Sequence, residues 1–192
     1  MGANVVKQAN RKRYITAHIL QSVSTAMVPF YTAIALKPQY AARWSKAVIK
    51  ADLTKMQKML RQVSPRAGNQ LGSNGIGYFV TFSLSNSTIN YTNGTTIPPG
   101  SVQFNFDTRV HRSIAHSVLP FYRRIAEFRP FASTLAKAIR KGDTKAVTCM
   151  TRSCIRTPAL KSVSIEGSGF ALLFEYSFSK YPYRNLLLNE SD

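Results

Sequence analysis

One segment of this chain occurs twice, and this internal repeat constrains the fold more than any other sequence feature. Residues 22–62 align with residues 113–153 without a gap, so that residue n matches residue n + 91. Thirteen of the 41 aligned positions are identical, whereas random pairing at average residue usage gives roughly two or three. The identical positions in the first copy are Ser22, Pro29, Phe30, Tyr31, Ile34, Ala35, Ala41, Lys46, Ala47, Lys50, Asp52, Met59 and Arg61.

A second match extends the repeat toward the C-terminus. The segment GIGYFVTF at 75–82 resembles GSGFALLF at 167–174, with the register shifted by one further residue. Two copies are too few for a solenoid, which needs at least three stacked units. We therefore predict a pseudo-dimer of two related modules of about 90 residues, packed against each other as one compact unit. The predicted limits are 1–92 for the first repeat, 93–108 for a connecting strand and loop, and 109–192 for the second repeat.

Three helices are expected at the start of each repeat. Apolar residues in the first segment recur at spacings of three and four, which is typical of one helix face. Asp52 and Asp143 are expected to cap the third helix of each repeat, and Gly142 suits the left-handed position that ends the preceding helix. The predicted helices span 11–36, 39–50 and 53–63 in the first repeat, and 109–127, 130–141 and 144–154 in the second.

Proline lies inside the first predicted helix of each repeat, as Pro29 and Pro120. Because proline removes a backbone hydrogen bond, it predicts a bend at these positions, with the following Phe and Tyr packed in the core. An alternative is an aromatic binding site. In that case Phe121 and Tyr122, next to Arg123 and Arg124, would be available to stack on nucleic acid bases.

Strands are expected after the helices. Residues 78–84 and 170–178 alternate between two sets of side chains, which is typical of half-buried strands. Asn74-Gly75 and Gly167–Gly169 predict tight turns, with a strand at 163–165 before the second turn and a further strand at 102–106. The uncharged stretch 85–101 is predicted to be a loop or hairpin tip. It holds three N-glycosylation sequons, at Asn86, Asn90 and Asn93, which its composition alone explains.

These elements predict an α+β fold. It is expected to be a tandem duplication of a helix-helix-helix-hairpin module with approximate two-fold symmetry, in which antiparallel strands pack on helices. The two sets of strands could join into a single sheet.

The N-terminal region also admits a targeting or membrane-spanning interpretation. Four basic residues precede the uncharged run 15–36. The matching segment of the second repeat, however, contains Arg123, Arg124 and Glu127, and charges are costly inside a bilayer. We therefore expect 15–36 to be a buried helix, with neither a signal peptide nor a transmembrane helix. The expected location is the cytoplasm or an assembled particle.

The charge of the chain indicates its partner. Twenty-six Lys and Arg oppose eight acidic residues, giving a formal net charge of +18. Repulsion at this level destabilises a compact state unless an anionic partner or counter-ions screen it. The predicted helical regions 37–66 and 109–161 carry most of the cations, whereas 67–108 contains no Lys or Arg.

The candidate anion-binding residues are cations that recur in both repeats or cluster in sequence. Spacings of three and four place several of them on one helix face, although a solvated helix face is the alternative explanation. Each phosphate neutralised by such a residue would release counter-ions. The candidates are Arg43, Lys46, Lys50, Arg61, Lys137, Lys141, Arg152, Arg123, Arg124, Arg11, Lys12 and Arg13.

No catalytic or metal-binding pattern accompanies this charge. His18, His111 and His116 have no counterparts in the other repeat, and neither a Walker A nor an HExxH motif is present. Cys149 and Cys154 have no partner cluster for a zinc site. We expect a non-enzymatic protein without cofactor or metal that binds nucleic acid or another polyanion by phosphate contacts, in a packaging, virion or nucleoid role. The alternatives are a self-assembling structural subunit and, less favoured, a protein that binds anionic membranes.

Overall fold

The computed structural model describes residues 14–67, 70–84 and 89–189. Arg11, Lys12, Arg13 and the sequon at Asn86 lie outside this range. The described helices are α2 Ala17–Leu36, α3 Pro38–Ile49, α4 Leu53–Val63, α5 Thr108–Glu127, α6 Arg129–Arg140 and α7 Thr144–Cys154. The described strands are β1 Gln70–Ser73, β2 Gly77–Phe82, β3 Tyr91–Thr96, β4 Leu160–Glu166, β5 Gly169–Phe174 and β6 Tyr183–Asn189.

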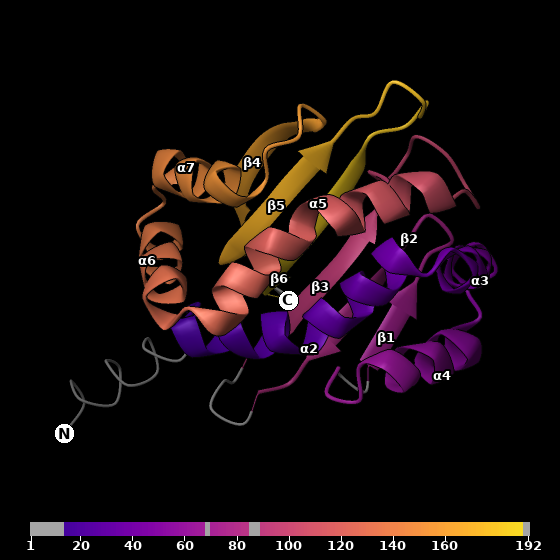
Figure 1. Cartoon of the computed structure of the whole chain (residues 1–192), viewed down its shortest axis with the longest axis horizontal. Helices are drawn as coiled ribbons and strands as arrows, with labels where there is room; N and C mark the ends of the chain where they lie inside the picture. The colour runs from indigo at the N-terminus through magenta and orange to yellow at the C-terminus, as the bar shows by residue number, and fades with distance from the viewer. Residues whose placement is uncertain (1–13, 68–69, 85–88, 190–192) are drawn as a thin grey trace.

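All six strands belong to one antiparallel sheet in the order β1-β2-β3-β6-β5-β4. The N-terminal and C-terminal strand sets meet at its centre, where β3 pairs with β6 from Tyr91↔Asn189 to Thr96↔Arg184. The helices lie over one face of this sheet, with α2 and α5 across its middle (Figure 1). The protein therefore has the mixed α+β architecture expected from the sequence.

The two sets of helices have matching lengths and caps. The helices α5, α6 and α7 each begin and end 91 residues after α2, α3 and α4. Asp52 accepts a hydrogen bond from the Lys55 amide at 3.0 Å, and Asp143 accepts one from the Ala146 amide at 2.9 Å. Both predicted caps are thus confirmed. Gly142 has the expected positive φ of 67°, and Ala51 adopts φ 50° at the same place in the first set.

Removal of the cap at α7 should weaken the fold modestly. We expect Asp143→Ala to lower the free energy of unfolding by about 1 kcal/mol, because amide groups of the first turn lose their acceptor. Asp143→Asn keeps an oxygen acceptor and should retain most of that stability. Urea unfolding of the two variants measures the difference, and equal loss in both would show that the cap contributes nothing.

The start of the first helix differs from the prediction. It was predicted at residue 11, but α2 begins at Ala17. Thr16 caps the helix there, because its side chain accepts a hydrogen bond from the Ile19 amide. Pro29 and Pro120 lie inside α2 and α5 and both helices continue past them, while the bend at these positions stays a prediction.

The strand predictions were wrong in three places. Residues 85–101 were predicted to be a loop or hairpin tip, but Tyr91–Thr96 within them form the central strand β3. Residues 102–106 form no strand, and Phe104 there is 69% exposed with a positive φ of 51°. The strand predicted over 170–178 ends at Phe174. The first prediction failed because it relied on composition. Asn, Gly and Thr are typical of loops, but here these residues form hydrogen bonds and close contacts at the centre of the sheet.

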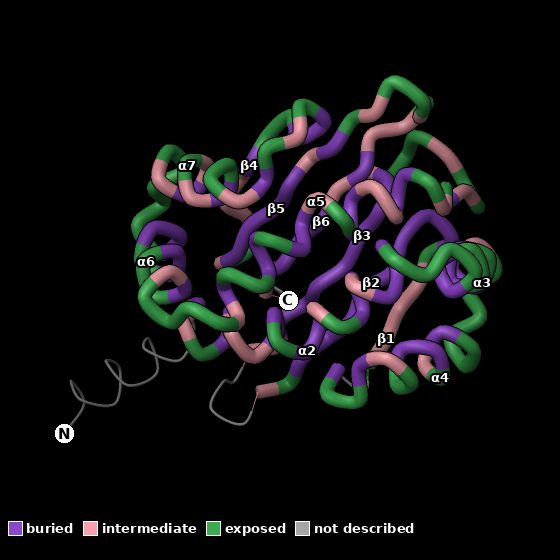
Figure 2. The backbone as a smooth tube through the Cα atoms, in the orientation of Figure 1, coloured by how far each residue is buried: buried purple, intermediate pink, exposed green. Residues whose placement is uncertain are grey.

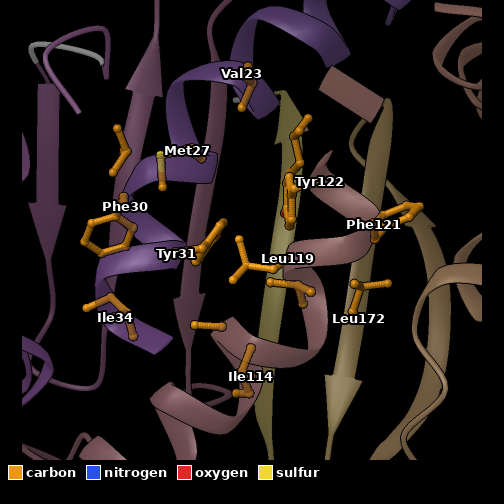
Figure 3. Packing of buried hydrophobic residues seen from close by; sticks show 14 of the residues in the cluster. Val23, Met27, Phe30, Tyr31, Ile34, Ile114, Leu119, Phe121, Tyr122 and Leu172 are labelled. Atoms are coloured by element: carbon orange, nitrogen blue, oxygen red, sulfur yellow. The ribbon is translucent and has the colours of Figure 1, made fainter. Parts of the chain in front are cut away.

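The core lies between the two long helices and the sheet. Phe30 and Tyr31 of α2 and Phe121 and Tyr122 of α5 are fully buried in it (Figure 3). The aromatic binding site considered for these residues is therefore wrong, since none is accessible to a base. Buried positions follow the inner faces of the helices and the strands, and exposed positions lie on the outer helices (Figure 2).

A closed ring of hydrogen bonds joins the two long helices to the two central strands. The Tyr31 hydroxyl donates to Asn93 Oδ1 at 2.6 Å, and Asn93 Nδ2 donates to the Tyr122 hydroxyl at 2.7 Å. The Tyr122 hydroxyl donates to Asn185 Oδ1, and Asn185 Nδ2 donates to the Tyr31 hydroxyl, both at 2.8 Å. All four residues are fully buried, so Asn93 is inaccessible to a glycosylating enzyme.

Among the described residues, α2 is the one helix long and apolar enough to cross a membrane by composition. Most of it is buried against α5, α6 and the sheet. Such burial is typical of a core helix in a folded domain, as the sequence comparison of the two repeats predicted.

Candidate polyanion interface

The predicted anion-binding residues that the structure describes all lie on the outer surface of the helical layer. Each of them is exposed, whereas the apolar residues between them face the core. They are Arg43, Lys46 and Lys50 of α3 and its C-terminal end, Arg61 of α4, Arg123 and Arg124 of α5, Lys137 and Lys141 of α6 and its end, and Arg152 of α7.

The structure separates the cations that match between the two repeats. Helices α3 and α4 lie at one end of the molecule and α6 and α7 at the other (Figure 1). Lys46 and Lys50 are therefore remote from Lys137 and Lys141. The exposed cations form two lateral groups. Arg124 lies with the α6 group, over the Phe128 and Phe131 rings, and Arg123 reaches Thr32 of α2 between the groups. A long polyanion can contact both groups at once, whereas a small anion cannot.

Three of the predicted residues are already engaged. Arg152 donates to the carbonyl oxygens of Leu160 and Lys161 at 3.1 and 3.4 Å. Arg124 lies over the Phe128 ring, with its guanidinium carbon 4.5 Å from the ring centre. Arg123 donates to the Thr32 hydroxyl at a long distance of 3.5 Å. Arg152 thus has a structural role at the edge of the sheet, while Arg124 is held in place with its charge at the surface.

Few carboxylates accompany these cations. Three of the acids, Asp52, Asp107 and Asp143, cap helices by accepting from backbone amides. Glu166 binds Arg184, which is the one ion pair among the described residues. The hydrogen bond from Ser164 and the contact with Arg184 hold the pKa of Glu166 below its usual value. Apart from Arg184, the described Lys and Arg residues have no carboxylate within bonding distance.

Two hollows flank α3 and bring its cations beside apolar surface. One, of about 690 Å³, lies between α3 and the end of α4 and is lined by Lys37, Tyr40 and Arg43. The other, of about 340 Å³, lies on the opposite side of α3 and is lined by Arg43, Lys46 and Phe106. Arg43 lines both, so a chain of phosphates passing over α3 would meet cations on either side of it.

A third hollow shows what the sequence comparison missed. It measures about 930 Å³, lies between α4 and the edge strand β1, and is lined by Lys58 together with Arg61. Lys58 was not predicted because its counterpart in the second repeat is Cys149. Lys58 lies three residues before Arg61, and this spacing, which places both on one helix face, would have identified it. Arg112 and Arg140 were also not predicted, but they bond the carbonyl oxygens of Ala35 and Ile15 and serve the fold.

His111 is a buried titratable group of the core. His111 is fully buried, and burial lowers its pKa to about 3, so it is neutral at ordinary pH. Its Nε2 bonds the Tyr78 hydroxyl at 2.9 Å, and the surrounding rings are Phe30 and Phe106. Within the described ranges, no group of three or more His, Cys, Asp or Glu side chains is arranged to hold a metal ion.

No protein-family model, curated protein or solved structure matches this chain.

Proposed function

We propose that this protein binds nucleic acid through phosphate contacts over its helical layer and catalyses no reaction. The observation that carries the proposal is the use of its carboxylates. Of the six described carboxylate side chains, three cap helices and Glu166 is paired with Arg184. Glu127 and Glu175 form no ion pair, so the exposed cations of α3, α4, α5 and α6 remain available to a polyanion. Binding of this kind is driven by counter-ion release and is independent of base sequence.

The spread of the cations favours a long ligand over a small one. They lie at both ends of the molecule and across α5 between them. We propose a packaging role, in the cytoplasm or inside an assembled particle, in which one protein covers a stretch of nucleic acid backbone. Other polyanions share the same chemistry and would compete for the same surface.

The proposal predicts that cations of α3 matter more than equal charges elsewhere. We expect the double variant Lys46→Gln/Lys50→Gln to bind a nucleic acid duplex about tenfold more weakly and to reduce the slope of log affinity against log salt by up to about 1.8. Fluorescence anisotropy with a labelled duplex, titrated at several salt concentrations, measures both quantities.

A matched control removes the same charge from residues outside the helices. Lys161→Gln/Lys180→Gln lies outside the helices, in β4 and in the turn before β6, and should leave affinity nearly unchanged. Equal loss of affinity in both double variants would show that only the net charge matters. Wild-type protein that binds no nucleic acid at low salt would contradict the proposed function.

We also propose that the chain arose by tandem duplication, with the two modules related by an approximate two-fold axis between β3 and β6. Helix bounds that match at an offset of 91 residues support this. So does a reciprocal pair of contacts: Gln21 donates to the Ala126 carbonyl and its counterpart Arg112 donates to the Ala35 carbonyl. Since β3 corresponds to β6, the first module would extend through Thr96, beyond the limit at residue 92 drawn from the sequence.

A structural subunit of a larger assembly is the second candidate. The observation that favours it is the sheet face turned away from the helices (Figure 1), which leaves a surface for contacts between chains. The membrane alternative relied on the apolar segment 15–36, most of which is α2 and is buried in the core. No observation on the described residues favours it.

A further inference from the structure

The sheet has a second apolar surface that is separate from the core. Side chains alternate along each strand, so Tyr78, Val80 and Phe82 of β2 face the helices and Phe79 faces the other way. The same alternation places Ala171 and Leu173 of β5 and Leu186 and Leu188 of β6 on that outer face. Leu186 is 6% exposed and Ala171 2% exposed, yet neither belongs to the hydrophobic core beneath the helices.

These residues lie close together across the sheet. Phe79 pairs with Gly94, Gly94 with Leu186, and Leu186 with Ala171, so they form one continuous row over four strands. Thr81, Thr92 and Leu188 form a neighbouring row. Phe79, Leu173 and Leu188 remain half-exposed. We call the group of Phe79, Ala171, Leu173, Leu186 and Leu188 the outer sheet patch.

The outer sheet patch is also electrically distinct from the rest of the protein. The strands carry two cations: Arg184, which is neutralised by Glu166, and the exposed Lys161 at the register shift of the edge strand β4. The chain as a whole carries +18, and its helical layer holds exposed cations at both ends. Two copies approaching through their helices would repel each other strongly, whereas two outer sheet faces bring fewer charges close together.

We propose that two copies of this protein pack back to back through the outer sheet patch, as a sheet-on-sheet sandwich. Two sheets packed this way lie about 10 Å apart, with side chains of the two faces interdigitating. The row of large and small residues suits such packing, because Phe79 adjoins Gly94 and Leu186 adjoins Ala171. A two-fold axis between the copies would combine with the approximate axis inside each chain, giving four modules in the D2 arrangement common among homo-oligomers.

The dimer would allow the proposed polyanion binding to bridge two ligand segments. Packing through the sheets turns the two cationic helical layers outward on opposite sides. One dimer then holds two nucleic acid segments, or two parts of one, and brings them together. This consequence rests on the proposed function, but the dimer itself does not.

Sedimentation velocity of the full chain, freed of nucleic acid at high salt, tests the proposal. We expect wild-type protein to sediment with twice the 21.4 kDa mass of one chain. Leu173→Asp should yield monomers, since it adds a second carboxylate beside the Arg184–Glu166 pair and so leaves a net negative charge in each half of the interface. Leu36→Asp is the matched control: it changes the net charge equally, but Leu36 is 64% exposed at the end of α2, and this variant should remain dimeric.

Salt separates this interaction from nucleic acid binding. Added salt should maintain or strengthen the dimer, because it screens the repulsion between cationic copies, while it weakens binding to phosphates. Wild-type protein that is monomeric at all concentrations would overturn the proposal, and so would a dimer that persists in Leu173→Asp. A folded monomeric Leu173→Asp that still binds a duplex would leave the proposed function intact, and circular dichroism establishes that it is folded.

Discussion

Replacement of Asn93 by alanine is expected to lower the free energy of unfolding by about 4 kcal/mol. The Asn93 amide accepts from Tyr31 and donates to Tyr122 and to the Leu186 carbonyl at 2.8 Å. All of these partners lie in the interior, so water cannot replace the lost bonds without opening the core. Burial also raises the pKa of Tyr31 to about 12, which keeps that hydroxyl a proton donor throughout the ordinary pH range.

Asn90→Ala provides a matched control for this prediction. Asn90 lies three residues earlier, at the end of the strand, where it accepts a hydrogen bond from Ser83 at an exposed site. Its replacement should cost less than about 0.5 kcal/mol. Urea unfolding measures both variants, and a loss below about 1 kcal/mol for Asn93→Ala would mean that the ring contributes little.

Asn185 should behave as the counterpart of Asn93. It bonds the same two tyrosines from β6 and also reaches the Gly94 carbonyl. Because the two asparagines share their partners, the double variant should lose less stability than the sum of the single variants, by about 1 kcal/mol or more. The ring thus couples α2, α5, β3 and β6, and disruption at one corner weakens the contact between the two halves of the chain.

The helices could be predicted from the sequence because their signals are local. Asp52 and Asp143 begin α4 and α7 where expected, and the third helices have the predicted bounds. Comparison of the two segments also identified 15–36 as a core helix rather than a membrane span. The sequence of residues 15–36 alone would not have distinguished a core helix from a membrane span.

The central strand could not be predicted because its stabilising contacts are not local. Tyr91–Thr96 reads as a loop: Asn93 and Gly94 sit together, and threonines surround them. Its place in the sheet depends on β6, about 90 residues later, and on two tyrosines from different helices. A side chain at Gly94 would collide with the Tyr78 carbonyl, since a Cβ would lie 2.0 Å from that oxygen. The glycine that suggested a turn is therefore required for close strand pairing.

The candidate interface was predictable by residue type but not by arrangement. Every predicted cation that the structure describes is exposed. The repeat suggested that Arg61 and Arg152 would act alike, yet Arg152 bonds two backbone carbonyls whereas Arg61 lines a hollow beside β1. Positions related by the 91-residue offset share a backbone environment, but the neighbours of a long side chain depend on both halves of the chain.

His111 is a core position at which the two halves of the chain differ, and it makes the stability of the protein depend on pH. Its position corresponds to Leu20, and both side chains are fully buried. Burial lowers the pKa of His111 from 6.5 to about 3. The folded state therefore binds fewer protons than the unfolded state between these values, so the stability present above pH 6.5 is lost as the pH falls toward 3.

We expect the wild-type protein to lose about 2 kcal/mol of unfolding free energy from this group between about pH 7 and pH 5. In His111→Leu, which installs the residue found at the matching position, that part of the pH dependence should vanish. Tyr78 keeps a hydrogen bond to the Thr95 hydroxyl at 3.3 Å in this variant, so its hydroxyl is not left without a partner. Urea unfolding of both proteins across this range measures the effect. The exposed His116→Gln variant should follow the wild-type curve, and parallel curves for wild type and His111→Leu would show that His111 takes up its proton without unfolding the core.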